Sequence, residues 1–464
     1  MKRVASITLP LLLIIAIVLP SFAEEPAVAP TPKEWTLAVF LNGDNNLDPF
    51  GIEDMKEMSA IGSNDWLNMV VLMDRENGPA ALYYIEKGNI KKLKDMGELD
   101  MGDYRQLIGF ARLVARDFPA KRYILGIWNH GSGWKNAAKK VFRGISYDDQ
   151  SGNHITTAQL GIALREIKGI FGHNIDILNF DACLMQMAEV VYVCRGSVDY
   201  IVASEEVEPG KGTPYDDVFK HLTATIKTDT FVKAWVKAFV SSYSGGSQGI
   251  DDCTQSGINV AAMEGVYDAI NGFAKAAMGG KFNAQFAQAL QQVQRFAYPE
   301  NVDLIHLATL LKGSITETGM QTACGKLIGA CQTAIIANGS NGAGLRNAKG
   351  LAIYLPHDYY LESGYTNLEF AKATMWDEMI LDLGKKSIAA ALVASVESGD
   401  LSELRKFVAN AAEQNPDVTA FVIQELNFRL YSEGGLPASL VEEVRALLAQ
   451  LQGSVSPSGA RASR

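Results

Sequence analysis

Residues 175–183 read IDILNFDAC, an apolar run that ends in a carboxylate and a thiol. Short apolar runs of the same kind are spread along the first half of the chain: TLAVFL (36–41), MVVLM (69–73), RYILGIW (122–128) and DYIVAS (199–204). Buried strands that alternate with longer helical segments are typical of α/β proteins with a mainly parallel sheet. The sequence therefore predicts an α/β fold with such a sheet at its centre.

Helical periodicity fills the gaps between these runs. Residues 104–118 and 156–171 each place apolar side chains on one helical face, and Thr156 or Thr157 is suited to cap the second helix. The segment 184–193, directly after Cys183, predicts another helix. Further along the chain, INVAAM (258–263) and GLAIYLP (350–356) predict two more strands.

The two ends of the chain differ from its middle in composition. Residues 1–23 combine two positive charges, an apolar stretch and a small-x-small cleavage pattern, which is typical of a secretory signal. A Pro-rich linker follows at 24–34, and we place the main domain at 35–383, a helical appendage at 384–452 and a disordered tail at 453–464. The protein is therefore expected to be exported to the periplasm or the extracellular space. A retained signal, which would tether it to a membrane, is the alternative; once the signal is removed, no membrane association is expected.

The charge and the cysteines exclude several classes of function. The 464-residue chain has a formal net charge of −10 and no basic runs, so we expect no nucleic-acid partner. Five cysteines is an odd number, so at least one thiol is free or pairs with another molecule. The cysteines and histidines show no spacing that is typical of a zinc site, and we expect no required cofactor.

Polar clusters follow the predicted strands directly: NGDNN (42–46), NHGSGW (129–134), DAC (181–183) and SEEVEPGKG (204–212). Each has a plain structural explanation by itself, as a turn, a loop or a small buried thiol. Parallel strands, however, bring their carboxyl ends to one edge of the sheet, where α/β proteins bind ligands. The convergence of the four clusters on that edge favours a reactive site.

A thiol and an imidazole are the reactive pair at this edge. Cysteine attacks as a thiolate and needs a neighbouring base, for which His130, 53 residues before Cys183, is the best-placed histidine. The backbone N–H groups of Gly131 and Cys183 would then form the oxyanion hole. With Cys183 at the start of the helix predicted for 184–193, the helix dipole would favour the thiolate.

The motifs taken together resemble a known family. WTLAVFLNGDNNL (35–47), WNHGSGW (128–134), ISYDDQSGNHIT (145–156), DILNFDACLMQMAEV (176–190), ASEEVEPGKGTPY (203–215) and GLAIYLP (350–356) are similar, in this order, to the clostripain family of cysteine peptidases, which belongs to the caspase and gingipain clan. The resemblance covers about residues 35–383. It implies a caspase-like three-layer α/β/α sandwich and a Cys–His dyad of Cys183 and His130 acting on protein or peptide substrates.

The resemblance also implies a pocket for the side chain before the cleaved bond. Peptidases of this family commonly cut after Arg or Lys, and Asp181 matches a position that supplies the pocket carboxylate. Lys211 stands where basic-specific relatives carry a second acid, and a lysine there would oppose a cationic substrate. Either Lys211 points to solvent, or Glu205, Glu206 or Glu208 compensates, or another residue is preferred before the cut.

Two regulatory features are implied in the same way. Relatives are often cleaved internally after the histidine loop, where this chain carries Lys135, Lys139, Lys140 and Arg143; a solvated loop is the alternative. Some relatives respond to calcium, and Asp148 and Asp149 are the nearest acidic pair, although two carboxylates make a poor cage.

Three functions are compatible with the sequence. The first is an exported cysteine endopeptidase. The second is a catalytically silent peptide-binding protein that has kept the fold, and the third is a thiol acyltransferase on the same scaffold. The intact dyad disfavours the silent protein.

Overall fold

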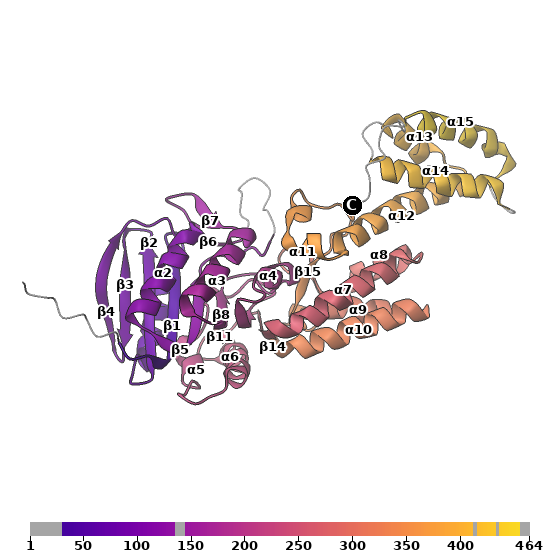
Figure 1. Cartoon of the computed structure of the whole chain (residues 1–464). Coiled ribbons are helices and arrows are strands. Elements are labelled where there is room, and N and C mark those ends of the chain that lie inside the picture. The colour runs from indigo at the N-terminus through magenta and orange to yellow at the C-terminus, as the bar shows by residue number, and fades with distance from the viewer. Residues whose placement is uncertain (1–29, 135–143, 412–414, 433–435, 455–464) are drawn as a thin grey trace, which may run out of the picture.

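The computed structural model describes residues 30–134, 144–411, 415–432 and 436–454. The predicted signal, most of the predicted linker, the cluster at Lys135, Lys139, Lys140 and Arg143, and nearly all of the predicted tail lie outside these ranges. Figure 1 shows a sheet with helices on both faces, a helical lobe beside it and a smaller group of helices at the far end.

Five parallel strands form the centre of a nine-stranded sheet with the order β14-β12-β9-β8-β5-β1-β2-β3-β4. The parallel strands coincide with the five apolar runs of the sequence: β1 (Lys33–Gly43), β2 (Leu67–Arg75), β5 (Ala120–Trp128), β8 (Ile175–Asp181) and β9 (Val198–Ala203). The predicted α/β class with a mainly parallel sheet is confirmed.

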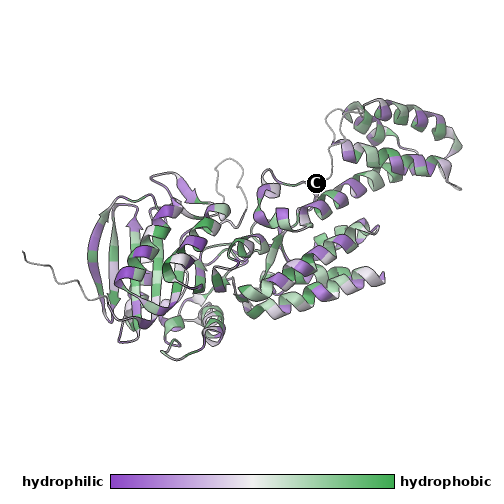
Figure 2. Ribbon diagram, viewed as in Figure 1, coloured by the Kyte–Doolittle hydropathy of each residue, from purple (hydrophilic) through white to green (hydrophobic). Residues whose placement is uncertain are grey.

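Antiparallel strands complete both edges of the sheet. The hairpin β3 (Gly78–Glu86) and β4 (Asn89–Gly97) extends it beyond β2, while β12 (Cys253–Asn259) and β14 (Ile335–Asn341) extend it beyond β9. Hydrophilic residues predominate in the outer strand β4 (Figure 2). Charged side chains on an edge strand discourage pairing with another chain.

Two helical layers cover the sheet. One face packs against α1 (Asp48–Ile61), α5 (Tyr215–Phe219) and α6 (Thr228–Ser242), and the other against α2 (Tyr104–Asp117), α3 (Thr157–Phe171) and α4 (Ala188–Val193). Side chains alternate along a strand, so in β1 Leu37 and Val39 enter the first core and Ala38 and Phe40 the second. The predicted three-layer sandwich is thus present.

The second core continues into a helical lobe. Its helices are α7 (Met263–Met278), α8 (Asn283–Gln292), α9 (Leu304–Ser314), α10 (Thr318–Ala334), α11 (Glu369–Ala373) and α12 (Trp376–Glu397). The remaining short elements of the chain are β6 (Ile145–Asp148), β7 (Asn153–Ile155), β10 (Ser244–Gly246), β11 (Gly249–Ile250), β13 (Asn301–Asp303), β15 (Ala352–Tyr354), η1 (Val260–Ala262), η2 (Ala343–Leu345) and η3 (Tyr365–Asn367).

A separate small core closes the chain. The second half of α12 packs with α13 (Ser402–Ala409), α14 (Pro416–Tyr431) and α15 (Ala438–Ser454). The boundaries placed at 384 and 453 fall inside α12 and α15, and the domain limits stay a prediction.

Two predicted elements are wrong in extent. The strand expected at 258–263 ends at Asn259, because the Asn259 side chain accepts a hydrogen bond from Ala261 N–H and starts η1, which leads into α7. The helix expected at 184–193 begins only at Ala188. Its first residues instead donate backbone hydrogen bonds to the loop after β9, from Leu184 to Glu206 and from Gln186 to Ser204.

Candidate active site

The ends of β5 and β8 place His130 and Cys183 beside each other. Trp128 pairs with Asp181 in the parallel register, and Asn129 N–H donates to the Asp181 carbonyl at 3.2 Å. His130 lies two residues after Trp128, and Cys183 lies two residues after Asp181. Neighbouring strands are about 4.8 Å apart, so both residues leave the sheet at the same point of its edge.

Gly131 makes this approach possible. A Cβ atom at this position would lie 2.4 Å from the carbonyl oxygen of Cys183 and 3.1 Å from Cβ of Ala182. Both distances are shorter than normal van der Waals contacts, and the carbonyl belongs to the backbone. The histidine loop therefore requires glycine here for steric reasons.

Asn46 fixes the ring of His130. Its side-chain Oδ1 lies 2.8 Å from His130 Nε2. An amide oxygen only accepts hydrogen bonds, so Nε2 carries the proton and Nδ1 is the basic nitrogen of the neutral ring. Burial lowers the pKa of His130 and Asp149 opposes this shift, so the ring is held mainly neutral near pH 7.

The other asparagines near the site shape the backbone. Asn42, Asn45 and Asn129 all donate from Nδ2 to the carbonyl of Tyr147, at 2.9–3.1 Å. The structural explanation thus holds for most of the polar residues in NGDNN, and Asn46 is the member that contacts the imidazole. The sequence pattern contained no signal that distinguished it from its neighbours.

Cys183 is partly exposed, and its thiol is protonated near neutral pH. Burial, followed by the charge of Glu208, raises the pKa of Cys183 to about 11, while the backbone N–H of Glu208 acts in the opposite direction by donating to the sulfur. The helix dipole invoked from the sequence is absent here, because α4 begins five residues later and Leu184 has a φ of 65°. That part of the prediction is wrong.

Asp181 belongs to a buried group of acids. Its carboxylate accepts hydrogen bonds from Thr213 N–H at 3.0 Å and Tyr215 Oη at 2.8 Å, and its carboxyl group contacts that of Glu208. Burial raises the pKa of Asp181 and, together with Asp181, the pKa of Glu208. On α1, Asp54 accepts from Trp128 Nε1 at 2.6 Å, and burial and the charge of Asp181 raise the pKa of Asp54.

The other predicted pocket residues do not join this group. Glu205 accepts a hydrogen bond from Gly350 N–H at 2.8 Å, and its carboxyl group contacts that of Asp303. Glu206 accepts from Ala297 N–H at 3.0 Å. Lys211 is exposed, and its Nζ donates to the Gln248 carbonyl at 3.3 Å. The structure therefore brings Asp181 together with Glu208, and not with Glu205 or Glu206.

Two hollows are lined in part by residues that interact with Cys183. One, of about 380 Å³, is lined by Asn46, His130, Gly131, Ser132, Tyr147, Asp149 and Tyr298. Tyr298 interacts electrostatically with Cys183 and comes from the segment between α8 and β13, which carried no recognisable motif. The other hollow, of about 460 Å³, includes Glu206 and Glu208.

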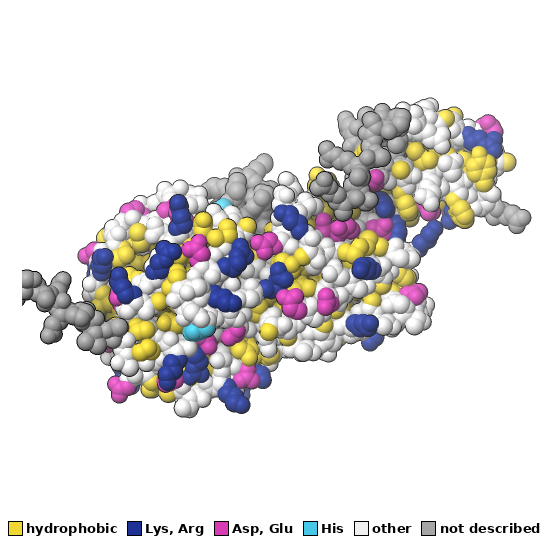
Figure 3. All heavy atoms as spheres, in the orientation of Figure 1, with side chains coloured by type: hydrophobic (Ala, Val, Ile, Leu, Met, Phe, Trp, Pro, Cys, Tyr) yellow, Lys and Arg dark blue, Asp and Glu magenta, His cyan; other side chains and the backbone are white. Residues whose placement is uncertain are grey.

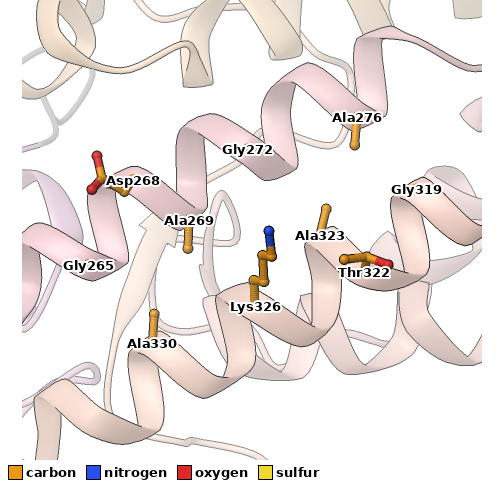
Figure 4. Close-up of a pocket in the computed structure, with 10 residues that line it drawn as sticks. All are labelled: Gly265, Asp268, Ala269, Gly272, Ala276, Gly319, Thr322, Ala323, Lys326 and Ala330. Atoms are coloured by element: carbon orange, nitrogen blue, oxygen red, sulfur yellow. The ribbon is translucent and has the colours of Figure 1, made fainter.

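A third hollow, of about 490 Å³, lies between α7 and α10, away from these residues (Figure 4). Small side chains such as Ala269 and Ala323 line most of it, with Asp268 and Lys326 as its charged members. Its lining includes no cysteine or histidine among the residues that the structure describes.

Asp148 and Asp149 do not fit a calcium site. The carboxylate of Asp148 accepts hydrogen bonds from the backbone N–H groups of Met101 and Ser151, and Asp149 instead lines the hollow at His130. Within the described parts of the chain, no three His, Cys, Asp or Glu side chains are grouped so that they could hold a metal ion.

Two surface properties complete the description. Acidic and basic side chains are interspersed over the face seen in Figure 3. Among the residues that the structure describes, no helix is both long and apolar enough to cross a lipid bilayer.

Comparison with known proteins places the chain in a family. The model of the clostripain family matches residues 39–383. Clostripain of Hathewaya histolytica is 29% identical over 223 residues, 41% of this chain and 42% of that protein, so the match spans less than half of this curated relative.

Solved structures agree in fold. A secreted C11 cysteine protease from Bacteroides thetaiotaomicron, in complex with an irreversible peptide inhibitor, has a TM-score of 0.59 at 21% identity and covers 74% of this chain and 100% of its own. An inactive zymogen C11 protease from Parabacteroides distasonis has a TM-score of 0.57 at 21% identity, covering 75% and 99%. The family match extends over most of the chain and includes both strand ends of the candidate site, and the chain therefore belongs to the clostripain family.

Proposed function

We propose that the chain is a cysteine endopeptidase in which Cys183 and His130 form the dyad. The observation that carries the proposal is the register of β5 and β8, which sets the two residues at equal positions past paired strand ends, with Gly131 packed on the Cys183 carbonyl. Membership of the clostripain family supports the same chemistry.

In the proposed reaction, His130 Nδ1 takes the proton of the Cys183 thiol as the sulfur attacks the scissile carbonyl. The N–H groups of Gly131 and Cys183 donate to the oxyanion of the tetrahedral intermediate. The imidazolium then returns its proton to the leaving amine, and a new amine terminus departs. Water, deprotonated by the same nitrogen, hydrolyses the thioester and restores the thiol.

The high pKa of Cys183 explains why the proton transfer to His130 accompanies the attack of the sulfur. A thiol with a pKa of about 11 is not a thiolate at rest. The neutral His130 must therefore accept the proton during the attack rather than before it, and Asn46 keeps the ring oriented for that transfer.

We further propose that the residue before the cut is Arg or Lys. The buried carboxylate of Asp181, two residues before the nucleophile, is the fixed partner that such a cation needs. Lys211 does not oppose this, since its amine is directed to the Gln248 carbonyl.

Export and internal cleavage belong to the same proposal. Residues 1–23 would direct the chain out of the cytoplasm, and cleavage after Lys135, Lys139, Lys140 or Arg143 would split it. We propose no required cofactor and peptides or proteins as substrates. Mass spectrometry of the secreted protein is expected to show a new N-terminus near residue 24 and two fragments, with a single chain in Cys183→Ala.

Labelling with a peptidyl ketone that alkylates thiols tests the central claim. Cys183 is expected to react under reducing conditions, with the rate falling at least about 100-fold in His130→Ala. Cys194→Ala is the matched control, because that thiol is fully buried. An unreactive Cys183 would favour the silent binding protein, and aminolysis outpacing hydrolysis of the acyl-enzyme would favour the acyltransferase.

A further inference from the structure

The hollow of about 380 Å³ at His130 carries an acidic charge that its own walls do not balance. Asp149 is exposed, and its carboxylate forms no hydrogen bond or ion pair within the described parts of the chain. No lysine or arginine that the structure describes lines this hollow. The carboxylate of Asp149 is therefore open to a cation that enters from solvent.

The backbone that carries Asp149 is held in place. Asp149 directly follows β6, and its N–H donates to the Asp44 carbonyl at 2.9 Å. On the same strand Tyr147 is only 5% exposed, and its hydroxyl lies 2.7 Å from Ser132 Oγ in the histidine loop. The hollow thus has a fixed wall on this side, and the carboxylate stands at the end of that wall.

Tyr298 gives the hollow a second tyrosine ring. It is partly buried, and the preceding residue, Ala297, is tied down because its N–H donates to Glu206 at 3.0 Å. Burial raises the pKa of Tyr298, so the phenol is neutral at physiological pH. The face of a neutral aromatic ring attracts a cation.

The proposed reaction indicates which part of a substrate reaches this hollow. His130 gives its proton to the nitrogen of the leaving amine, and that nitrogen belongs to the residue after the cut. The Cβ atom of this residue is only two covalent bonds from the nitrogen, so its side chain must lie beside His130.

The pocket proposed for the residue before the cut lies elsewhere. Asp181 is bonded to Thr213 and Tyr215 and contacts Glu208, and none of these four residues lines the hollow at His130. The two hollows therefore serve different substrate residues, and the one at His130 is left for the residue after the cut.

We propose that the hollow at His130 binds the side chain of the residue after the cut and favours lysine or arginine there, through the carboxylate of Asp149 and the ring of Tyr298. The proposal rests on the peptidase function proposed above. The apolar stem of such a side chain can lie against the tyrosine rings while its charged end stays in water beside Asp149. Because Asp149 is exposed, pairing with it requires little loss of hydration.

The test uses three peptides that differ only in the residue after the cut, which is lysine, norleucine or glutamate. N-methylation of the next peptide bond prevents cleavage after that lysine. The wild type should prefer lysine, then norleucine, then glutamate. Asp149→Asn is expected to lower the ratio of kcat/KM for lysine over norleucine roughly two- to fivefold, as for a solvent-exposed ion pair.

Three further variants sharpen this test. Asp149→Glu keeps the charge and should retain the preference for lysine, whereas Asp149→Lys should reverse it in favour of glutamate. Asp65→Asn is the matched control, because Asp65 is an exposed aspartate in the loop before β2 and does not line the hollow. Its ratios should equal those of the wild type.

The ratio distinguishes a binding role of Asp149 from its effect on the base. The charge of Asp149 raises the pKa of His130, so its removal can change the rates for all three peptides, but by the same factor. If both rates fall in Asp149→Asn while their ratio stays at the wild-type value, Asp149 acts on His130 alone and the proposed subsite is wrong.

Binding to the inactive Cys183→Ala protein separates this inference from the peptidase function. By calorimetry, the lysine peptide should bind more tightly than the glutamate peptide, and adding Asp149→Lys should reverse that order. Equal binding of the two peptides in both proteins would overturn the subsite. A reversal without any cleavage that depends on Cys183 would uphold the subsite and reject the peptidase.

Discussion

At the scale of single residues, the contact between Asn46 and His130 sets the protonation of the proposed base. Because burial lowers the pKa of His130, the acid limb of kcat/KM in the wild type should lie below pH 6.5. In Asn46→Asp, a carboxylate would stand where Oδ1 accepts from Nε2 and would favour the imidazolium. We expect the acid limb to move up by about one pH unit.

The pH dependence of kcat/KM checks this, with Asn46→Ala as the comparison. That variant removes the hydrogen bond without adding charge, so the rate should fall roughly tenfold while the limb moves little. If the acid limb of kcat/KM is unchanged in Asn46→Asp, the contact between residue 46 and His130 does not control the pKa of His130.

Gly131 gives a second prediction at this scale. In Gly131→Ala the new methyl would meet the Cys183 carbonyl, so the two strand ends must separate. We expect kcat/KM to fall more than about 100-fold, since displacements near 1 Å have effects of that size. Gly109→Ala is the matched control, because nothing lies within 4 Å of that position on α2 and activity should be retained.

The sequence predicted the place of the reactive residues better than their partners. Strand ends in a parallel sheet share one edge by geometry, so the apolar runs predicted that His130, Cys183 and Asp181 lie at that edge. That their two strands are neighbours was a condition of this prediction, and the pairing of β5 with β8 meets it. The partners Glu208 and Tyr298 depend on how loops distant in sequence fold over that edge, and Glu205 follows the same strand as Glu208 yet faces Gly350.

At the scale of helices and strands, the start of α3 is set by local interactions at its N-terminal cap. Thr156 forms a capping box with Gln159, accepting from Gln159 N–H at 3.2 Å while Gln159 Oε1 accepts from Thr156 N–H at 2.9 Å. Thr156→Ala should lower the free energy of unfolding by about 1 kcal/mol. Thr157→Ala should cost less, because the hydroxyl of Thr157 has no hydrogen-bond partner among the described residues. Urea unfolding of both variants checks this, and equal losses would contradict it.

Elements that lacked a clear apolar pattern were missed. Strand β4, with the sequence NIKKLKDMG, is exposed along most of its length and is held by its pairing with β3 rather than by burial. The opposite error occurred at 258–263, where an apolar run suggested a strand through a point at which the chain turns. The spacing of apolar residues in a sequence indicates which side chains are buried. It therefore predicts a helix or strand only where burial of one face determines the backbone conformation.

At the scale of the whole molecule, several carboxyl groups on the sheet and on the helices that cover it are shielded from water. Burial raises the pKa of Glu57, Asp74 and Glu189 to about 7 in each case. In the folded protein these groups keep a proton that the unfolded chain has already released above about pH 4. Unfolding therefore releases protons, and the stability of the molecule should fall as the pH rises from 5 to 7 and level off above that.

Asp74 allows the contribution of a single carboxyl group to this pH dependence of stability to be measured. It is fully buried at the end of β2, its Oδ1 accepts from Arg75 N–H, and its Oδ2 has no hydrogen-bond partner in the described parts of the chain. Asp74→Asn removes the titration, so the free energy of unfolding of the variant relative to the wild type should rise by about 2 kcal/mol between pH 5 and pH 8. Urea unfolding at both pH values measures the difference. The unpaired amide nitrogen can lower stability at every pH, so the change with pH, and not the value at one pH, decides the matter. A difference that stays constant would show that Asp74 is ionised in the folded protein throughout this pH range, and that burial does not raise its pKa.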